Sequence, residues 1–128
     1  MLLKVATMKP QDIDAITQSL EKNNHVLEAQ VDFLKTIANR HRFKIVMALG
    51  QIEGEMEQRD LQKIVGISKA NLSQHLAMLR NAGVINSRPY GRITYLSLKF
   101  PAIKDACVLV REMITQRSFD LMHPEKWK

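Results

Sequence analysis

The chain has 128 residues, 45% of them hydrophobic, and a formal net charge of +6 at pH 7. This length suits a single domain with one core, and the single cysteine excludes an intrachain disulfide. The sequence has no apolar run of about 18 residues and no positively charged leader followed by an apolar stretch. We therefore expect a cytoplasmic protein without a membrane span.

Helical periodicity marks the first third of the chain. Apolar residues recur three or four positions apart, first at Ile13, Ile16 and Leu20 and then, after a break at residues 23–24, at Leu27, Val31, Leu34 and Ala38. Two helices with these residues would carry more apolar surface than one small domain needs. We expect part of that surface to meet a second protomer; packing in the chain's own core or as a lid is the alternative.

Three short helices, separated by glycines, are predicted in the middle of the chain. Residues 40–49 form a helix that Gly50 ends, residues 57–65 form one that Gly66 ends, and a third starts at Ser68, a good N-cap, and stops at Gly83.

The third helix has two different faces. Leucines at positions 72, 76 and 79 form an apolar stripe, while the opposite face carries Ala70, Ser73, Gln74, Ala77 and Asn81. Small side chains would let this face approach a groove closely, and the amide of Gln74 can both donate and accept a hydrogen bond at a base edge. A helix that only faces solvent would more often carry Glu and Lys there.

A hairpin and a final helix follow. Residues 84–88 and 92–98 predict two strands joined through residues 89–91, with a basic tip. Pro101 then opens a helix with an apolar series at Ile103, Ala106, Cys107, Val110 and Ile114.

The positive charge is concentrated in one segment. Residues 61–104 contain no Asp or Glu but seven basic residues, namely Lys63, Lys69, Arg80, Arg88, Arg92, Lys99 and Lys104. The rest of the chain holds the other 12 of the 19 basic residues and all 13 acidic ones, so it carries no excess positive charge. Localised charge of this sign is expected for a surface that binds nucleic acid; a merely soluble basic surface is the alternative.

A short helix, a tight turn, a polar-faced helix and a basic hairpin follow one another as in a winged helix-turn-helix, whose second helix enters the major groove. From Leu34 to about Ser118, the sequence resembles the ArsR/SmtB family of small bacterial repressors. The resemblance lies in the segments LKTIANRHRFKIVMAL, ISKANLSQHLAMLRNAGVI and GRITYLSL. It implies a mainly α fold with a small β-hairpin, in one domain of residues 1–128.

The same resemblance implies a homodimeric transcriptional repressor that binds a palindromic operator in double-stranded DNA. Residues 57–83 would form the helix-turn-helix, residues 84–99 the wing, and residues 1–38 and 101–128 helical dimerisation elements. The DNA contacts would be Ser68, Lys69, Asn71, Ser73, Gln74, Arg80, Arg88, Tyr90 and Arg92. The dimer contacts would be Leu27, Val31, Leu34, Ile103, Cys107, Val110 and Ile114.

The roles of the predicted DNA contacts differ. We expect Ser73 and Gln74 to contact base edges, and the cationic side chains to contact phosphates or the minor groove. His75 lies nearer the leucine stripe than the outward face, so we expect a structural hydrogen bond there rather than a base contact.

The effector sites of well-known members of that family are incomplete in this sequence. Glu-Gln-Arg at residues 57–59 stands where arsenic and cadmium sensors carry a cysteine pair, and an arginine cannot replace a thiolate ligand. Asp105 and Cys107 could stand for half of the zinc site of other members, but Ser118 and Leu121 occupy its later positions. We expect no metal site and no cofactor, and the effector remains open.

Other functions remain possible from the residues. The winged helix could dock a protein partner without binding DNA sequence-specifically. Cys107 could pair across a dimer axis in a redox- or persulfide-responsive regulator, although its place on the apolar stripe favours packing. An enzyme has the least support, because the sequence has no Gly-rich phosphate loop and no nucleophile with a base at a recognisable spacing.

Overall fold

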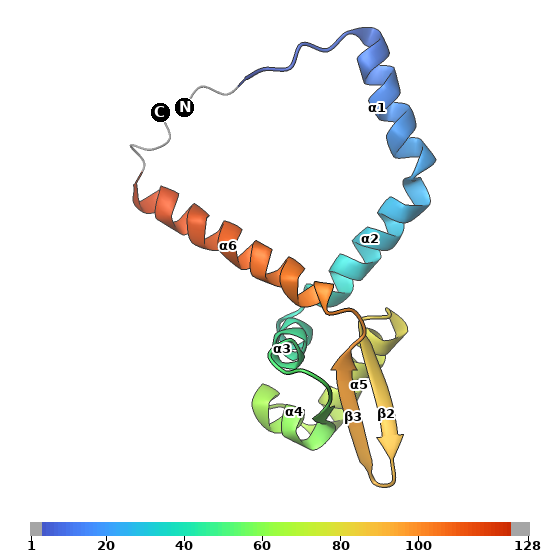
Figure 1. Cartoon of the computed structure of the whole chain (residues 1–128), viewed down its shortest axis with the longest axis vertical. Helices are drawn as coiled ribbons and strands as arrows, with labels where there is room; N and C mark the ends of the chain where they lie inside the picture. Colours follow the sequence, from blue (N-terminus) through green and yellow to red (C-terminus); the bar gives the residue numbers. More distant parts are fainter. Residues whose placement is uncertain (1–3, 124–128) are drawn as a thin grey trace.

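The computed structural model describes residues 4–123, which form six helices and one three-stranded antiparallel sheet. The elements are α1 (Pro10–Lys22), α2 (Asn24–Ile37), α3 (Arg40–Leu49), β1 (Met56–Glu57), α4 (Gln58–Val65), α5 (Lys69–Asn81), β2 (Ile85–Tyr90), β3 (Ile93–Leu98) and α6 (Ala102–Met122). Elements α3 to β3 form a body, from which α2 with α1 and the long α6 extend as two arms (Figure 1).

The predicted helix boundaries are confirmed where capping signals define them. Asn39 caps α3, because its Oδ1 accepts hydrogen bonds from the backbone N–H groups of His41 and Arg42 at 3.0 and 3.1 Å. The Oγ of Ser68 accepts from the backbone N–H of Asn71 at 3.1 Å and so starts α5. Gly66 ends α4 with a φ of +75°, which glycine adopts without steric cost.

The wing differs from the prediction at its turn. Tyr90 pairs with Ile93, so the connection consists of Gly91 and Arg92 rather than of residues 89–91, and Gly91 takes a φ of +61°. Pro89 lies inside β2, which tolerates a proline because it is an edge strand of the sheet order β1-β3-β2. Strand β1 was not predicted, and its two residues pair with β3. Glu57, predicted as the first residue of a helix, belongs to this strand, and α4 begins at Gln58.

The core fills the space between α3, α4, α5, the sheet and the first turns of α6. Its buried residues are Ile37, Ile45, Val46, Ala48, Leu49, Leu61, Val65, Leu72, Leu76, Leu79, Val84, Ile85, Leu96, Ile103 and Cys107. The last two, Ile103 and Cys107, were predicted as dimer contacts. In the single chain each is only 7% exposed, and α6 contacts α3, so both contribute to this chain's own core and leave little surface for a partner.

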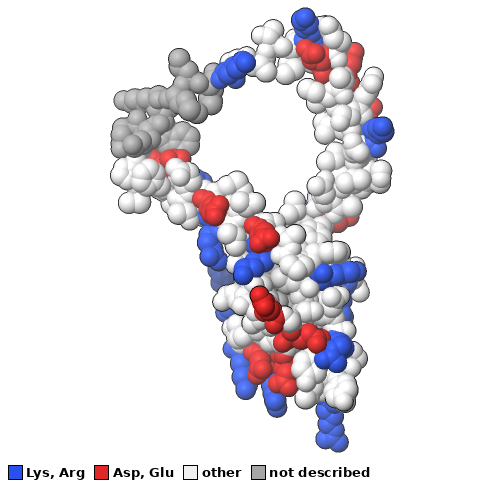
Figure 2. All heavy atoms as spheres, in the orientation of Figure 1, with Lys and Arg blue, Asp and Glu red and all other residues white. Residues whose placement is uncertain are grey.

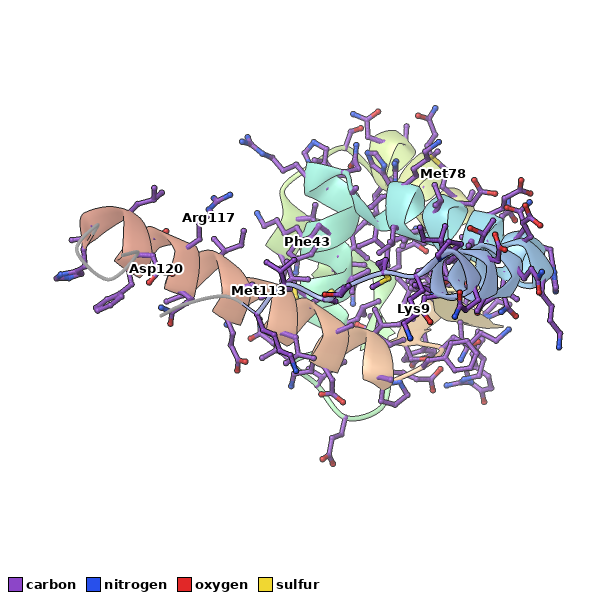
Figure 3. The ribbon with its side chains drawn as sticks, turned by 90° about the horizontal axis from the view of Figure 1, so that it is seen from above. Lys9, Phe43, Met78, Met113, Arg117 and Asp120 are labelled. Atoms are coloured by element: carbon purple, nitrogen blue, oxygen red, sulfur yellow. The ribbon has the colours of Figure 1, made fainter. Side chains whose placement is uncertain are left out.

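The two arms leave their apolar residues uncovered. No residue of α1 is buried, and Ile13, Ile16 and Leu20 are each about half exposed. Beyond Cys107, α6 extends away from the body past Met113 and Arg117 (Figure 3). Its side chains at 109, 110, 113 and 114 are exposed although all are apolar. Among the described residues, no helix is both long and apolar enough to span a membrane.

Two residues of α4 test the position of the core. Leu61 is fully buried whereas Ile64, on the same helix, is 48% exposed. We expect Leu61→Ala to lower the free energy of unfolding by about 2–5 kcal/mol, because it leaves a cavity. Ile64→Ala serves as the matched control and should cost less than about 1 kcal/mol. Urea denaturation followed by circular dichroism measures both, and equal losses would contradict this core.

Candidate nucleic-acid interface

The outward face of α5 is the centre of the candidate interface. Burial of Leu72, Leu76 and Leu79 turns this helix so that its opposite face points to solvent. The predicted contacts on it, Lys69, Asn71, Ser73, Gln74 and Arg80, are all exposed. Arg80 lies seven residues after Ser73 and therefore on the same face, about 16 Å along the helix from Lys69. The contacts are thus distributed along the full length of α5.

A hollow joins the start of α5 to the wing. Its volume is about 490 Å³, and its lining residues are Glu57, Gln58, Arg59, Gln62, Lys69, Arg92, Ile93 and Thr94. Lys69 and Arg92, which are 23 positions apart in the sequence, therefore line the same concave surface. Sequence reasoning missed Arg59 and Gln62 as members of this surface, because nothing local indicates that α4 lies beside the wing. Arg59 is 74% exposed and lies 3.5 Å from the carboxylate of Glu57.

Arg88, which was predicted to contact DNA, has a partner within the chain. Its Nε and Nη2 both donate to the Glu55 carboxylate at 2.9–3.1 Å, and its Cζ lies 4.7 Å from the centre of the Tyr95 ring. The hydrogen bonds from Arg88 lower the pKa of Glu55, and the same bonds raise the pKa of Arg88. Arg88 thus reaches across the middle strand, and its charge is matched within the chain.

The tip of the wing remains cationic. Arg92 is exposed in the turn, and Tyr90 beside it is 70% exposed. Figure 2 shows a basic side chain at the lowest point of the wing, while acidic side chains gather on the part of the body that faces the viewer. The positive charge of residues 61–104 is therefore partly offset by acidic neighbours. Its exposed basic side chains include Arg92 at the wing tip and Lys69 and Arg80 on α5.

Behind α5, an arginine joins three helices. The Nε of Arg42 donates to the backbone oxygen of Thr36, and its Nη1 lies 3.2 Å from Nδ1 of His75 and 3.3 Å from Sδ of Met78. Since a guanidinium can only donate, Nδ1 of His75 must accept, which requires a neutral imidazole with its proton on Nε2. The structural hydrogen bond predicted for His75 is confirmed.

Burial lowers the pKa of His75, and the charges of Arg42 and His41 lower it further. The ring of His41 lies 5.4 Å from that of His75. The Cys107 thiol has the opposite shift, since burial raises its pKa and keeps it protonated at neutral pH. Within residues 4–123, no three His, Cys, Asp or Glu side chains lie close enough to hold a metal ion.

The lowered pKa of His75 predicts a pH dependence of stability. Above about pH 6.5 the imidazole is neutral in both the folded and the unfolded chain. As the pH falls below that value, the unfolded chain takes up the proton first, so the folded state loses stability. His75→Gln keeps an acceptor for Arg42 but cannot titrate, and we expect its unfolding free energy to depend less on pH between 7.5 and 5.5 (about one pH unit either side of the unperturbed value).

His25→Gln is the matched control, because His25 is exposed on α2. Urea denaturation at three pH values measures the wild type and both variants. A His75→Gln curve parallel to that of the wild type would contradict a neutral, partly buried imidazole with a lowered pKa.

Comparisons with known proteins agree with this geometry. The model described as bacterial regulatory protein, arsR family, matches residues 39–87. The chain is 30% identical over 99 residues to the transcriptional activator HlyU of Vibrio cholerae, covering 77% of this chain and 87% of HlyU. It is 35% identical over 57 residues to the biofilm growth-associated repressor of Xylella fastidiosa, covering 44% of this chain and 48% of that repressor.

Among solved structures, the homodimeric winged helix-turn-helix domain Mb0332 of Mycobacterium bovis superposes with a TM-score of 0.64 at 20% identity, over 77% of this chain and 89% of that one. This likeness supports the winged helix-turn-helix fold, in which α4 and α5 form the helix-turn-helix and β2 and β3 the wing. The chain belongs to the arsR family of bacterial regulatory proteins and is a DNA-binding transcriptional regulator.

Proposed function

We propose that this regulator is a cytoplasmic homodimer that represses transcription by occupying a palindromic operator. The observation that carries the proposal is the exposed, small and polar face of α5 next to a hollow with Lys69 and Arg92 on its wall. A protein bound over a promoter excludes the polymerase, and one of the relatives is named a repressor. Since HlyU is named an activator, a reporter assay with and without the protein decides the direction of control.

The contacts to DNA divide into two classes. Ser73 and Gln74 contact base edges, because they project from the outward face of α5 with side chains that hydrogen-bond directly. Lys69, Arg80 and Arg92 contact phosphates, which provides affinity that depends on salt but carries no sequence information. Asn71 and Tyr90 are further exposed polar contacts, and the Ser68 oxygen caps α5 where the helix meets the DNA.

Arg88 has a different role in this proposal from the one expected from the sequence. Its bidentate pairing with Glu55 and its stacking on Tyr95 make it part of the wing's support. A phosphate would have to compete with that carboxylate, so Arg92 is the stronger candidate for contacting the backbone.

The arms supply the dimer interface in this proposal. Leu27, Val31 and Leu34 on α2 are 37–64% exposed, and Val110 and Ile114 on α6 are 47% and 46% exposed. Burying such faces against a second copy removes apolar surface from water, and a two-fold axis between the arms places two copies of α5 side by side. Two half-sites about 34–36 Å apart would then be contacted together.

Two substitutions separate base contacts from phosphate contacts. We expect Gln74→Ala to reduce the preference for operator over scrambled duplex, at a cost of about 1–3 kcal/mol on the operator. Arg92→Ala should weaken binding to both duplexes alike and reduce the salt slope by about 1 per protomer. Fluorescence anisotropy at two salt concentrations, with the duplex upstream of the protein's own gene, measures both effects.

Lys22→Ala, in the last turn of α1 and remote from α5, is the control for loss of one positive charge. Equal losses for Gln74→Ala and Arg92→Ala on both duplexes would rule out this division of roles. Absence of any duplex preference in the wild type would favour a protein-docking module instead.

One substitution on α6 tests the dimer. Val110→Glu places a charge on the exposed apolar face, and burying it unpaired is costly, so we expect a shift from dimer to monomer at micromolar concentration. Glu112→Ala lies about 200° around the same helix and should leave the dimer intact. Light scattering measures the mass, and a monomeric wild type would remove the dimer from the proposal.

A further inference from the structure

The junction around Arg42 is where the α2 arm meets the helix that faces DNA. Thr36 lies in the last turn of α2, where backbone carbonyls lack a partner within the helix, and Arg42 donates to its oxygen. The same guanidinium contacts His75 and Met78, which are three positions apart and therefore share one face of α5. A single side chain on α3 thus joins the base of the arm to the back of α5.

Several features hold this junction in one geometry. The Asn39 side chain caps α3 at the backbone N–H of Arg42, so the arginine starts from a defined position. Its guanidinium is planar, with donors in a fixed fork, and it engages groups on two other helices at once. Figure 3 shows Met78 where α5 approaches the corner between α2 and α3.

The contacts of Arg42 lie at the edge of the candidate interface. His75 and Met78 engage α3, and they lie four and seven positions after Asn71, on the same side of α5 as that predicted DNA contact. This side of α5 is therefore held against α3 by Arg42, in addition to the leucine stripe. A change here alters how α5 sits relative to the arm without removing any DNA-contacting side chain.

We propose that Arg42 is a positioning residue that sets the half-site spacing selected by the dimer, through its hydrogen bonds to the end of α2 and to His75. This rests on the homodimer of the proposed function. In such a dimer the arms meet at the two-fold axis, so the placement of α5 relative to α2 determines the distance between the two copies of α5. One added base pair moves a half-site by about 3.4 Å along the duplex and also rotates it, so small changes at the junction alter the preferred spacing.

The experiment measures spacing selectivity with the full chain. Wild-type protein first selects duplexes from a random-sequence library, and the selected duplex is then lengthened or shortened by one or two base pairs at its centre. Anisotropy titrations give the ratio of affinities between native and altered spacing for each variant. We expect the wild type to lose about tenfold or more on altered spacing, comparable to the cost of a mismatched site.

The variants separate positioning from mere loss of structure. Arg42→Met keeps the apolar stem but cannot donate, and Arg42→Lys keeps the charge but lacks the planar fork. We expect both, and His75→Leu, to reduce the spacing ratio to less than half of the wild-type value while dimerisation in light scattering is unchanged. His75→Gln retains an acceptor and should retain most of the ratio, and Thr36→Ala, which keeps the backbone oxygen, is the matched control.

The outcomes distinguish this inference from the proposed function. A wild type that selects no duplex, or binds all spacings equally, overturns both. If the wild type has a clear spacing preference and Arg42→Lys and His75→Leu keep it, only the positioning role is overturned. If these variants bind duplexes of every spacing more weakly but the affinity ratio is unchanged, the positioning role is also overturned, because that result indicates only a general structural contribution.

Discussion

Burial of the leucine stripe on α5 is the constraint on which the rest of the molecule depends. Leu72, Leu76 and Leu79 are each at most 1% exposed, and together they fill the space between α3, α4 and the sheet. Burying this stripe fixes the orientation of α5 about its own axis. Ser73 and Gln74 then lie on the exposed side of the helix. The stability of the core and the presentation of the candidate DNA-contacting face are consequences of the same packing.

The basic residues of the candidate interface are not equally available to DNA, although composition alone does not distinguish them. An acid-free segment carries the positive charge, but folding brings Glu55 against Arg88, so one of its cations is matched internally. Lys69 and Arg92 keep their charges open on the wall of one hollow. In the proposed function, Arg92 contacts phosphates while Arg88 supports the wing, so the two roles belong to different arginines of the same hairpin.

The two arms carry apolar faces that remain exposed in the single chain. Helix α1 contributes no buried residue, and most of α6 beyond Cys107 is exposed despite its apolar residues. Exposed apolar faces of this extent are typical of surfaces that bind another protein. Arg42 links the end of α2 to α5, so in the proposal a change in how the arms associate also affects the helix that contacts DNA.

The sequence by itself determined the helices, the order of the elements and the rotation of α5, because periodicity, capping residues and glycines act locally. It also indicated the nucleic-acid partner through charge, and His75 as a structural group through its place beside the leucine stripe. Only the tertiary structure decided that Ile103 and Cys107 belong to the core, that Arg88 pairs with Glu55, and that Arg42 reaches two helices. The hydrogen-bonded contacts of Arg88 and Arg42 join residues 33 and up to 36 positions apart in the sequence, and no local pattern specifies which distant side chains meet when the core closes.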